Sequence, residues 1–197
     1  MDVTRQGSRT PSNIGPAAIP VVGFVGSSGS GKTTLIERIL PLLRAERCRV
    51  GVLKHAHKGF QIDRPGKDSH RALEAGAVQV LVASSRRWAL IGEDTDDQAE
   101  PALGRLLGRF SPRTVDLVLA EGFSHESIPK IEVFRPSYGR PPRCWPHDPD
   151  VIAVASDAAV ETVPPVVALD LNRPEAVAAL VLAHLFPRSG GDQKAGK

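Results

Sequence analysis

The sequence predicts an α/β protein with a mostly parallel sheet, flanking helices and an antiparallel element at one edge. Short apolar runs alternate with helical patterns over most of the 197 residues, as in parallel strands joined by helices. Two apolar runs near the middle are separated only by a short polar stretch, which indicates a hairpin. With 41% hydrophobic and 24% charged residues, the composition is that of an ordinary globular chain.

The expected elements alternate between strands and helices. We expect strands at residues 21–25, 49–54, 78–83, 88–91, 115–120, 130–134, 151–155 and 166–169. We expect helices at residues 32–46, 68–75, 98–110 and 175–186. Pro41 should kink the first helix or end its first half, because proline removes a hydrogen bond and clashes with the preceding turn. Asp68 suits the N-cap of the second helix, Gly76 its end, and Ser84-Ser85 the turn of the hairpin.

The two ends of the chain differ from the rest. Residues 1–19 mix Arg, Ser, Gly, Pro and Asn with little periodicity, and residues 188–197 are RSGGDQKAGK. We interpret them as a disordered leader and a disordered tail around one domain at residues 20–187.

Composition also limits the expected partners and location. The net charge of +3 includes no run of five basic residues, so we do not expect a nucleic-acid partner. The sequence has no apolar stretch of membrane-spanning length, and the first 20 residues contain no apolar core of a secretory signal. Cys48 and Cys144 form no C-x-x-C motif, so reduced thiols in the cytoplasm are the simplest interpretation.

Residues 26–33 match G-x-x-x-x-G-K-[ST], the P-loop pattern, and follow the first apolar run. Its glycines allow successive backbone N–H groups to point at one anion, and the following helix adds its positive end. We expect Lys32 to reach the β- and γ-phosphates of a nucleotide, and the Thr33 hydroxyl to ligate Mg²⁺. The motif predicts the P-loop NTPase fold; the alternative is a Gly/Ser turn with a surface lysine. The expected nucleotide-binding residues here are Gly26, Ser28, Gly29, Ser30, Gly31, Lys32, Thr33 and Thr34.

A P-loop site also needs an acid near its metal. The apolar run 115–120 suits a buried parallel strand and ends in Glu121, which could hold the water shell of Mg²⁺ or orient the attacking water. We therefore assign catalytic roles to Lys32 and Glu121. Asp116 lies at the start of the same strand and suits the site less. The alternative for Glu121 is a loop carboxylate paired with a surface base.

A second polar segment follows the strand at 49–54. Lys54, His55 and His57 lie where a parallel strand delivers ligand contacts, and an anion is their natural partner. Asp63 and Asp68 could serve Mg²⁺ through water. Two alternatives stay open: the two histidines could bind a transition metal, or the segment could be a solvated polar loop.

These motifs together resemble one family, the molybdopterin-guanine dinucleotide biosynthesis adaptor protein B family (MobB). The resemblance covers about residues 20–185. Beyond the P-loop, the motifs that carry it are Lys54-His55-x-His57, Asp63-x-Pro65-Gly66-Lys67-Asp68-Ser69, Ala75-Gly76-Ala77, Ser84-x-x-Arg87-Trp88-Ala89-Leu90, Asp116-Leu117-x-Leu119-x-Glu121-Gly122-Phe123, Pro129-Lys130-Ile131 and Ile152-Ala153-Val154-Ala155-Ser156-Asp157. The family often has a further histidine where Lys58 stands.

The resemblance implies a GTP-binding, weakly GTP-hydrolysing protein that is usually a homodimer. It also implies that the protein has a partner enzyme, the molybdopterin guanylyltransferase, which joins GMP to molybdenum-bound molybdopterin. For the guanine, we expect Asp157, at the end of the strand 151–155, to accept hydrogen bonds from N1–H and the 2-amino group. The full N-K-x-D base motif is absent, and the alternative is that Asp157 caps the following turn.

The leading function is therefore a GTP- and Mg²⁺-dependent accessory protein of molybdenum cofactor maturation. The sequence contains no identifiable catalytic glutamine or arginine finger, although Arg64, Arg86 or Arg87 could supply an arginine across a dimer. An edge at 88–91 would suit the dimer interface. The runner-up is a P-loop kinase of a small metabolite. A nucleotide-switched assembly ATPase is disfavoured, because Ser27 and Ser28 stand where such a protein has a second lysine.

Overall fold

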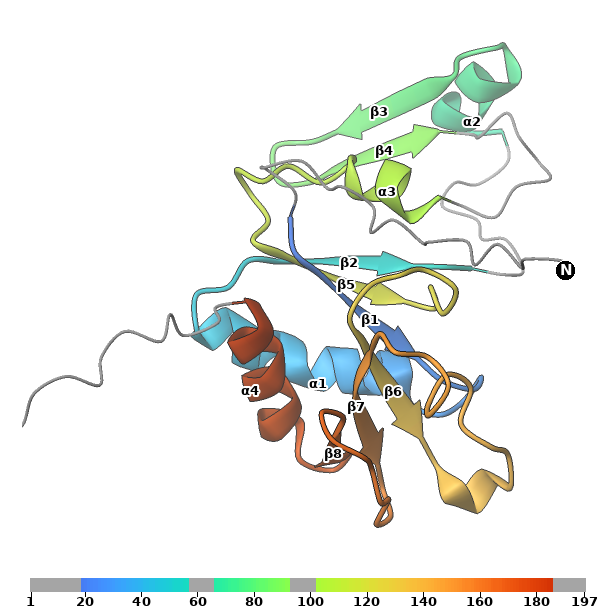
Figure 1. The fold of residues 1–197 in the computed structure, drawn as a ribbon. Coiled ribbons are helices and arrows are strands. Elements are labelled where there is room, and N and C mark those ends of the chain that lie inside the picture. The colour runs from blue at the N-terminus through green and yellow to red at the C-terminus, as the bar shows by residue number, and fades with distance from the viewer. Residues whose placement is uncertain (1–18, 57–65, 93–101, 186–197) are drawn as a thin grey trace, which may run out of the picture. The chain divides into compact units, whose positions relative to one another are not determined.

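The computed structural model describes residues 19–56, 66–92 and 102–185 (Figure 1). The chain divides into two compact units, which are described separately. The first contains the described residues up to His55 and from Leu103 onward, and the second lies between them in the sequence. His57 and Asp63, expected to contact nucleotide and metal, lie outside the described residues, as does Arg64.

The first unit contains a six-stranded sheet in which every pair of neighbours is parallel. The strand order is β2-β5-β1-β6-β7-β8, so β1 lies inside the sheet between β5 and β6 (Figure 1). The predicted mostly parallel α/β fold is confirmed. The strands are β1 (Val21–Val25), β2 (Val50–Lys54), β5 (Leu117–Glu121), β6 (Lys130–Phe134), β7 (Val151–Ser156) and β8 (Val167–Asp170).

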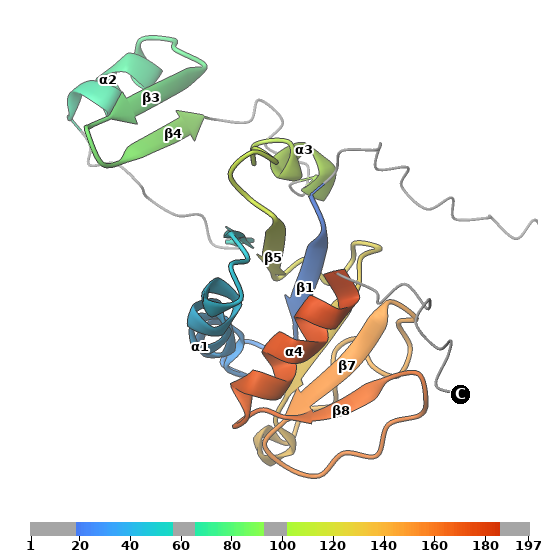
Figure 2. The same ribbon diagram turned by 90° about the vertical axis from the view of Figure 1, so that its left-hand side faces the viewer.

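The helices of this unit and the alternating side chains of β1 together form two apolar clusters. Helices α1 (Lys32–Ala45) and α4 (Pro174–Leu185) lie side by side (Figure 2) and form one cluster with Val22 and Phe24. Helix α3 (Leu103–Leu107) forms the other cluster with Val21. Because successive side chains of a strand point to opposite faces, the central strand is buried along its whole length.

Helix α1 continues through Pro41 to Ala45, so the expectation that Pro41 would end its first half is wrong. Pro41 lies on the exposed face of the helix, where water can satisfy the carbonyl that loses its partner. Ile39 and Leu43, on either side of the proline, are fully buried. The buried stripe therefore holds the segment helical despite the local propensity.

The second unit contains α2 (Asp68–Glu74), β3 (Gln79–Ala83) and β4 (Trp88–Gly92). The predicted hairpin is confirmed, and the backbone N–H of Ser84 donates to the carbonyl of Arg87 at 2.7 Å. The two strands form a sheet of their own, whereas the sequence suggested an edge of the main sheet. The N-cap of α2 is Lys67, so Asp68 is the first helical residue and not the cap.

Candidate functional site

The glycine-rich motif connects the carboxyl end of β1 to the first residue of α1, as the sequence predicted. Gly26 and Gly31 have φ values of +131° and +101°, which residues with a side chain rarely adopt. A Cβ added to Gly26 would lie 2.3 Å from the carbonyl oxygen of Val133, so β6 leaves no room for a side chain there. The loop therefore needs glycine for its conformation and for its approach to the neighbouring strand.

Lys32 lies across the opening of this phosphate loop, which we define as residues 26–33. Its Nζ donates to the carbonyl oxygens of Gly26 and Ser27 at 3.0 and 2.9 Å. Burial lowers the pKa of the Lys32 ammonium, and the charges of Arg143 and Lys54 act in the same direction, against the opposing effect of Glu121. The ammonium is thus held at the loop by two carbonyl oxygens, beside the segment whose N–H groups a phosphate would contact.

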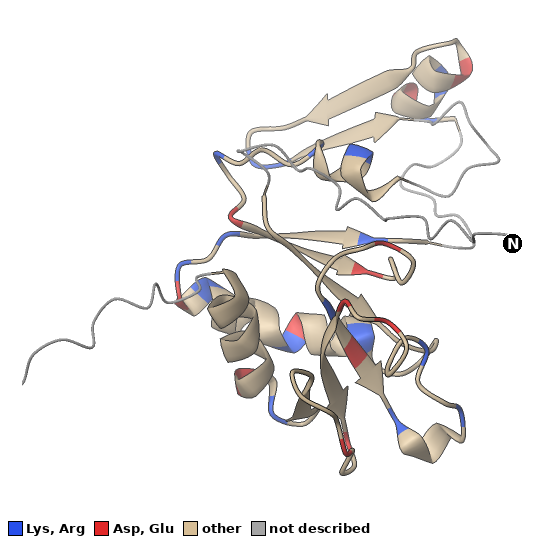
Figure 3. Cartoon of the chain, viewed as in Figure 1, with Lys and Arg blue, Asp and Glu red and all other residues tan. Residues whose placement is uncertain are grey.

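Three side chains predicted to belong to the site meet beside Lys32. The Thr33 hydroxyl lies 2.9 Å from both carboxylate oxygens of Glu121, and Lys54 Nζ donates to Thr33 Oγ1 at 3.1 Å. Lys54 and Glu121 are paired positions of β2 and β5, and Figure 3 shows a basic and an acidic position at these strand ends. Because Glu121 is only 8% exposed, its charge is shielded from bulk water.

The oxygen atoms of Thr33 and Glu121 fit the ligand preference of Mg²⁺. The Lys54 ammonium lies 3.4 Å from the Glu121 carboxylate, so a positive charge already stands at this oxygen cluster. Within the described ranges, no group of three His, Cys, Asp or Glu residues could hold a metal. In proteins, Mg²⁺ usually keeps several waters and binds substrate phosphate oxygens beside one or two protein ligands. Asp68, also expected near the metal, lies in the second unit, where its carboxylate is 4.0 Å from Arg71.

The opposite end of β5 carries a different acidic group. Asp116 forms an ion pair of 2.6 Å with Arg49, next to the start of β2. It therefore joins the amino-terminal ends of these strands and does not contribute to the phosphate loop, in agreement with the preference for Glu121.

His55 directly follows the Lys54 position and lies beside the acidic strand end. Its imidazole ring stacks on Phe123 with a centroid distance of 5.4 Å, and its backbone N–H donates to the Glu121 carbonyl at 2.9 Å. A Cβ added to Gly122 would lie 3.2 Å from the Cβ of His55. The strand end therefore fixes the position of His55 close to the Thr33–Glu121 cluster.

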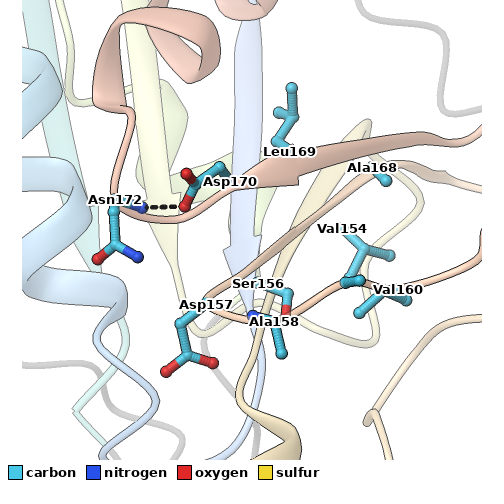
Figure 4. A pocket seen from close by; sticks show the side chains of 10 residues that line it. Val154, Ser156, Asp157, Ala158, Val160, Ala168, Leu169, Asp170 and Asn172 are labelled. Atoms are coloured by element: carbon cyan, nitrogen blue, oxygen red, sulfur yellow. Dashed lines mark hydrogen bonds between the residues drawn. The ribbon is translucent and has the colours of Figure 1, made fainter.

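A hollow of about 410 Å³ lies at the carboxyl ends of β7 and β8 (Figure 4). Asp157, Asp170 and Asn172 are among the residues that line it. The cap of the turn after β7 is formed by Ser156, whose hydroxyl accepts the N–H of Ala158 at 3.2 Å. The Asp157 carboxylate instead forms an ion pair with Arg135, so the turn-cap alternative for Asp157 is not what the structure shows.

Two residues of the segment after β6 contact the phosphate loop and were not predicted from the sequence. Arg135 Nε donates to the Ser30 carbonyl at 2.9 Å, and the Tyr138 hydroxyl donates to the Gly29 carbonyl at 3.2 Å. The available signal was the position of Arg135, immediately after a strand that ends at the ligand-facing edge of a parallel sheet.

The fold and the site are those of a P-loop NTPase-like protein. A glycine-rich loop follows an inner strand of the parallel sheet, and a lysine lies across that loop. A hydroxyl lies beside the acidic residue at the end of another strand. The family model for MobB, molybdopterin guanine dinucleotide synthesis protein B, matches residues 21–157. The chain belongs to the MobB family.

Individual relatives support this membership. The chain is 42% identical over 176 residues to the molybdopterin-guanine dinucleotide biosynthesis adapter protein of Escherichia coli K12, with 89% of this chain and 99% of that protein covered. It is 43% identical over 156 residues to the protein of the same name from Haemophilus influenzae, covering 79% and 83%. The crystal structure of Bacillus subtilis MobB matches with a TM-score of 0.64 and 27% identity over 84% of this chain and 97% of that one.

Proposed function

We propose that this protein is a GTP- and Mg²⁺-binding adapter in the biosynthesis of molybdopterin guanine dinucleotide. The observation that carries the proposal is the convergence of Lys32, Thr33, Lys54 and Glu121 at the phosphate loop, in a chain of the MobB family. Two relatives with over 40% identity are named as adapters of this pathway. These comparisons support the adapter function and give no support to the kinase alternative.

The phosphate end of the nucleotide would bind to the loop. Backbone N–H groups of residues 26–33 and the amino-terminal end of α1 present partial positive charge to the phosphates, and Lys32 adds a full charge. Thr33 and Glu121 would hold Mg²⁺, which when bound would neutralise phosphate charge. Lys54 would then be free to contact a phosphate oxygen, because its present partners would bind the metal.

The base would bind in the hollow beside Asp157. This hollow lies at the ends of β7 and β8, on the β6 side of the strand that carries the phosphate loop. A carboxylate there can accept hydrogen bonds from the N1–H and the 2-amino group of guanine, whereas adenine offers neither donor. With adenine, the carboxylate would lose its contacts to water without gaining these bonds, which favours GTP over ATP.

The adapter role would follow from nucleotide-dependent ordering of the residues around the loop. In a weak hydrolysis reaction, Glu121, which lies 2.9 Å from the Thr33 hydroxyl, would orient the attacking water molecule. The proposed partner is molybdopterin guanylyltransferase, together with molybdopterin or the molybdenum cofactor. His55 and Lys54, at the end of β2, are the proposed contacts for an anionic ligand beside the nucleotide.

The hairpin of the second unit supports the proposal of a homodimer. Leu81 and Leu90 are cross-strand partners, and Trp88 lies on the same face of the ribbon. Trp88 is 71% exposed and Leu81 64% exposed, and an isolated two-stranded ribbon with an exposed apolar face is marginally stable in water. A second copy would cover this face.

Sedimentation equilibrium tests the dimer. Wild-type protein should sediment as a dimer, and Leu81→Asp should shift it toward the monomer. Val163→Asp, at an exposed valine of the first unit, is the matched control and should remain dimeric. A wild-type monomer, or a Leu81→Asp variant that dimerises like wild type, would contradict the proposed interface.

We also propose a cytoplasmic location, based on Cys48 and Cys144, which are both buried free thiols. None of the helices in the described ranges is long and apolar enough to cross a membrane.

The test of guanine recognition is Asp157→Asn. The amide cannot accept both guanine donors, but it can donate to the 2-oxo group of xanthine, so GTP affinity should fall and XTP affinity should rise. Affinities are measured by calorimetry with Mg²⁺ present. Unchanged selectivity between GTP and XTP would refute the role of Asp157. Wild-type GTP affinity in Lys32→Ala would refute the phosphate site itself.

A further inference from the structure

Arg135 lies between the two ends of the proposed nucleotide site. It immediately follows β6, which is hydrogen-bonded to β1 on one side and to β7 on the other. The phosphate loop follows β1, and Asp157 follows β7. Because all three strands are parallel, a long side chain at the end of β6 can reach both neighbours.

The guanidinium group of Arg135 contacts both neighbours at once. Its Nε donates to the carbonyl oxygen of Ser30 in the phosphate loop at 2.9 Å, and its Nη1 forms an ion pair with the Asp157 carboxylate. Its Nη2 lies near Gly31, because a Cβ added there would be 3.5 Å from this nitrogen. One planar, rigid group therefore joins the loop to the carboxylate.

We infer that Arg135 is a positioning residue that fixes the Asp157 carboxylate for guanine recognition and couples it to the phosphate loop. This inference rests on the proposed function. A carboxylate that accepts two parallel donors must hold one orientation, and the ion pair with a guanidinium anchored on Ser30 restricts its rotation. The positive charge also offsets the repulsion between Asp157 and the nucleotide phosphates.

The inference distinguishes arginine from lysine at this position. A lysine keeps the positive charge, but its single nitrogen lacks the rigid fork that spans the Ser30 carbonyl and the Asp157 carboxylate in a fixed geometry. Arg135→Lys should therefore retain most of the electrostatic effect and lose the orientation of Asp157. The expected consequence is weaker discrimination between bases, beyond any general loss of nucleotide affinity.

Tyr138→Phe is the matched control, because it removes another hydrogen bond from the same segment to the same loop. The Tyr138 hydroxyl donates to the Gly29 carbonyl, and the structure shows no hydrogen bond from it to Asp157 within the described residues. If contacts from this segment only brace the loop, both variants should change the affinities for all nucleotides by the same factor. A positioning role predicts different results for the two variants.

The experiment is calorimetric titration of the full chain with GTP and with ITP, which lacks the 2-amino group of guanine. Arg135→Lys should lower GTP affinity roughly tenfold, the effect of about one hydrogen bond to a charged group, and ITP affinity much less. The ratio of GTP to ITP affinity should therefore fall, whereas Tyr138→Phe should leave it at the wild-type value. In an Asp157→Asn background, Arg135→Lys should no longer change the ratio.

The outcomes separate this inference from the proposed function. A wild-type protein that binds neither nucleotide, or binds both equally, would overturn the proposed guanine recognition and the role of Arg135 with it. Wild-type preference for GTP together with an unchanged ratio in Arg135→Lys would overturn the inference alone. The inference would also be overturned if Arg135→Lys changed the ratio of GTP to ITP affinity by the same factor in the wild-type and the Asp157→Asn backgrounds. Circular dichroism spectra establish that each variant is folded before titration.

Discussion

Replacement of Glu132 by glutamine should lower the free energy of unfolding by about 2–3 kcal/mol. The Glu132 side chain, only 1% exposed, is a buried carboxylate on β6. One oxygen accepts the backbone N–H of Arg143, and the other accepts those of Cys144 and Trp145 at 3.0 and 2.7 Å. This carboxylate therefore fixes the segment 143–145 through hydrogen bonds to its backbone.

The magnitude follows from these contacts. The amide of glutamine has one acceptor oxygen, which can take the place of the oxygen that binds two N–H groups, and its NH₂ then faces the third donor. A hydrogen bond to a charged group contributes about 2 kcal/mol and a neutral one about 1 kcal/mol. The three bonds of wild type therefore contribute about 6 kcal/mol, and the two bonds of the variant about 2 kcal/mol. Removal of a buried charge recovers part of this difference through a smaller desolvation cost.

Chemical denaturation followed by circular dichroism measures the free energy of unfolding. Glu161→Gln, at an exposed glutamate, is the matched control and should change it by less than about 0.5 kcal/mol. Amide hydrogen exchange provides a local measurement, because the N–H groups of Cys144 and Trp145 should lose protection in Glu132→Gln. A free energy of unfolding within about 0.5 kcal/mol of wild type, with protection unchanged, would show that the Glu132 carboxylate does not stabilise the segment 143–145.

Two further predictions concern titratable groups away from the phosphate loop. Hydrogen bonds from Arg49 lower the pKa of Asp116 to about 2, so the stabilisation from this pair is present above the ordinary pKa of about 4 and is lost as pH falls toward 2. Acid denaturation should accordingly show less loss of stability between pH 4 and 2 in Asp116→Asn than in wild type, and equal losses would contradict the prediction. Burial raises the pKa of the Cys48 and Cys144 thiols, so a thiol reagent should react slowly with the native protein and rapidly after unfolding. Rapid labelling of the native protein would contradict their burial.

The local parts of the site were predictable from the sequence, because they depend on neighbouring residues. The P-loop pattern specifies a strand, a glycine-rich turn and a helix in a single short segment. Glu121 was found because an apolar run marks a buried strand and the acid follows at its end. The structure places Thr33 beside Glu121, in agreement with this interpretation.

Arg135 could not be identified in the same way. Its partners, Ser30 and Asp157, follow other strands, so the contacts depend on which strands are neighbours in the sheet. Glu132 binds backbone N–H groups of the segment 143–145, and no local sequence pattern marks that pairing. Alternation of apolar residues identifies strands but does not specify their order. At Pro41 a local rule gave the wrong answer. The proline predicted a helix end, but burial of Ile39 and Leu43 maintains the helix.

Nucleotide selectivity distinguishes a guanine-specific site from a general triphosphate site. In a calorimetric titration with Mg²⁺, the full wild-type chain should bind GTP at least about tenfold more tightly than ATP, because adenine leaves the Asp157 carboxylate without its two donors. Lys32→Ala should abolish the binding of both. Equal or tighter binding of ATP by the wild-type protein would contradict guanine recognition by Asp157.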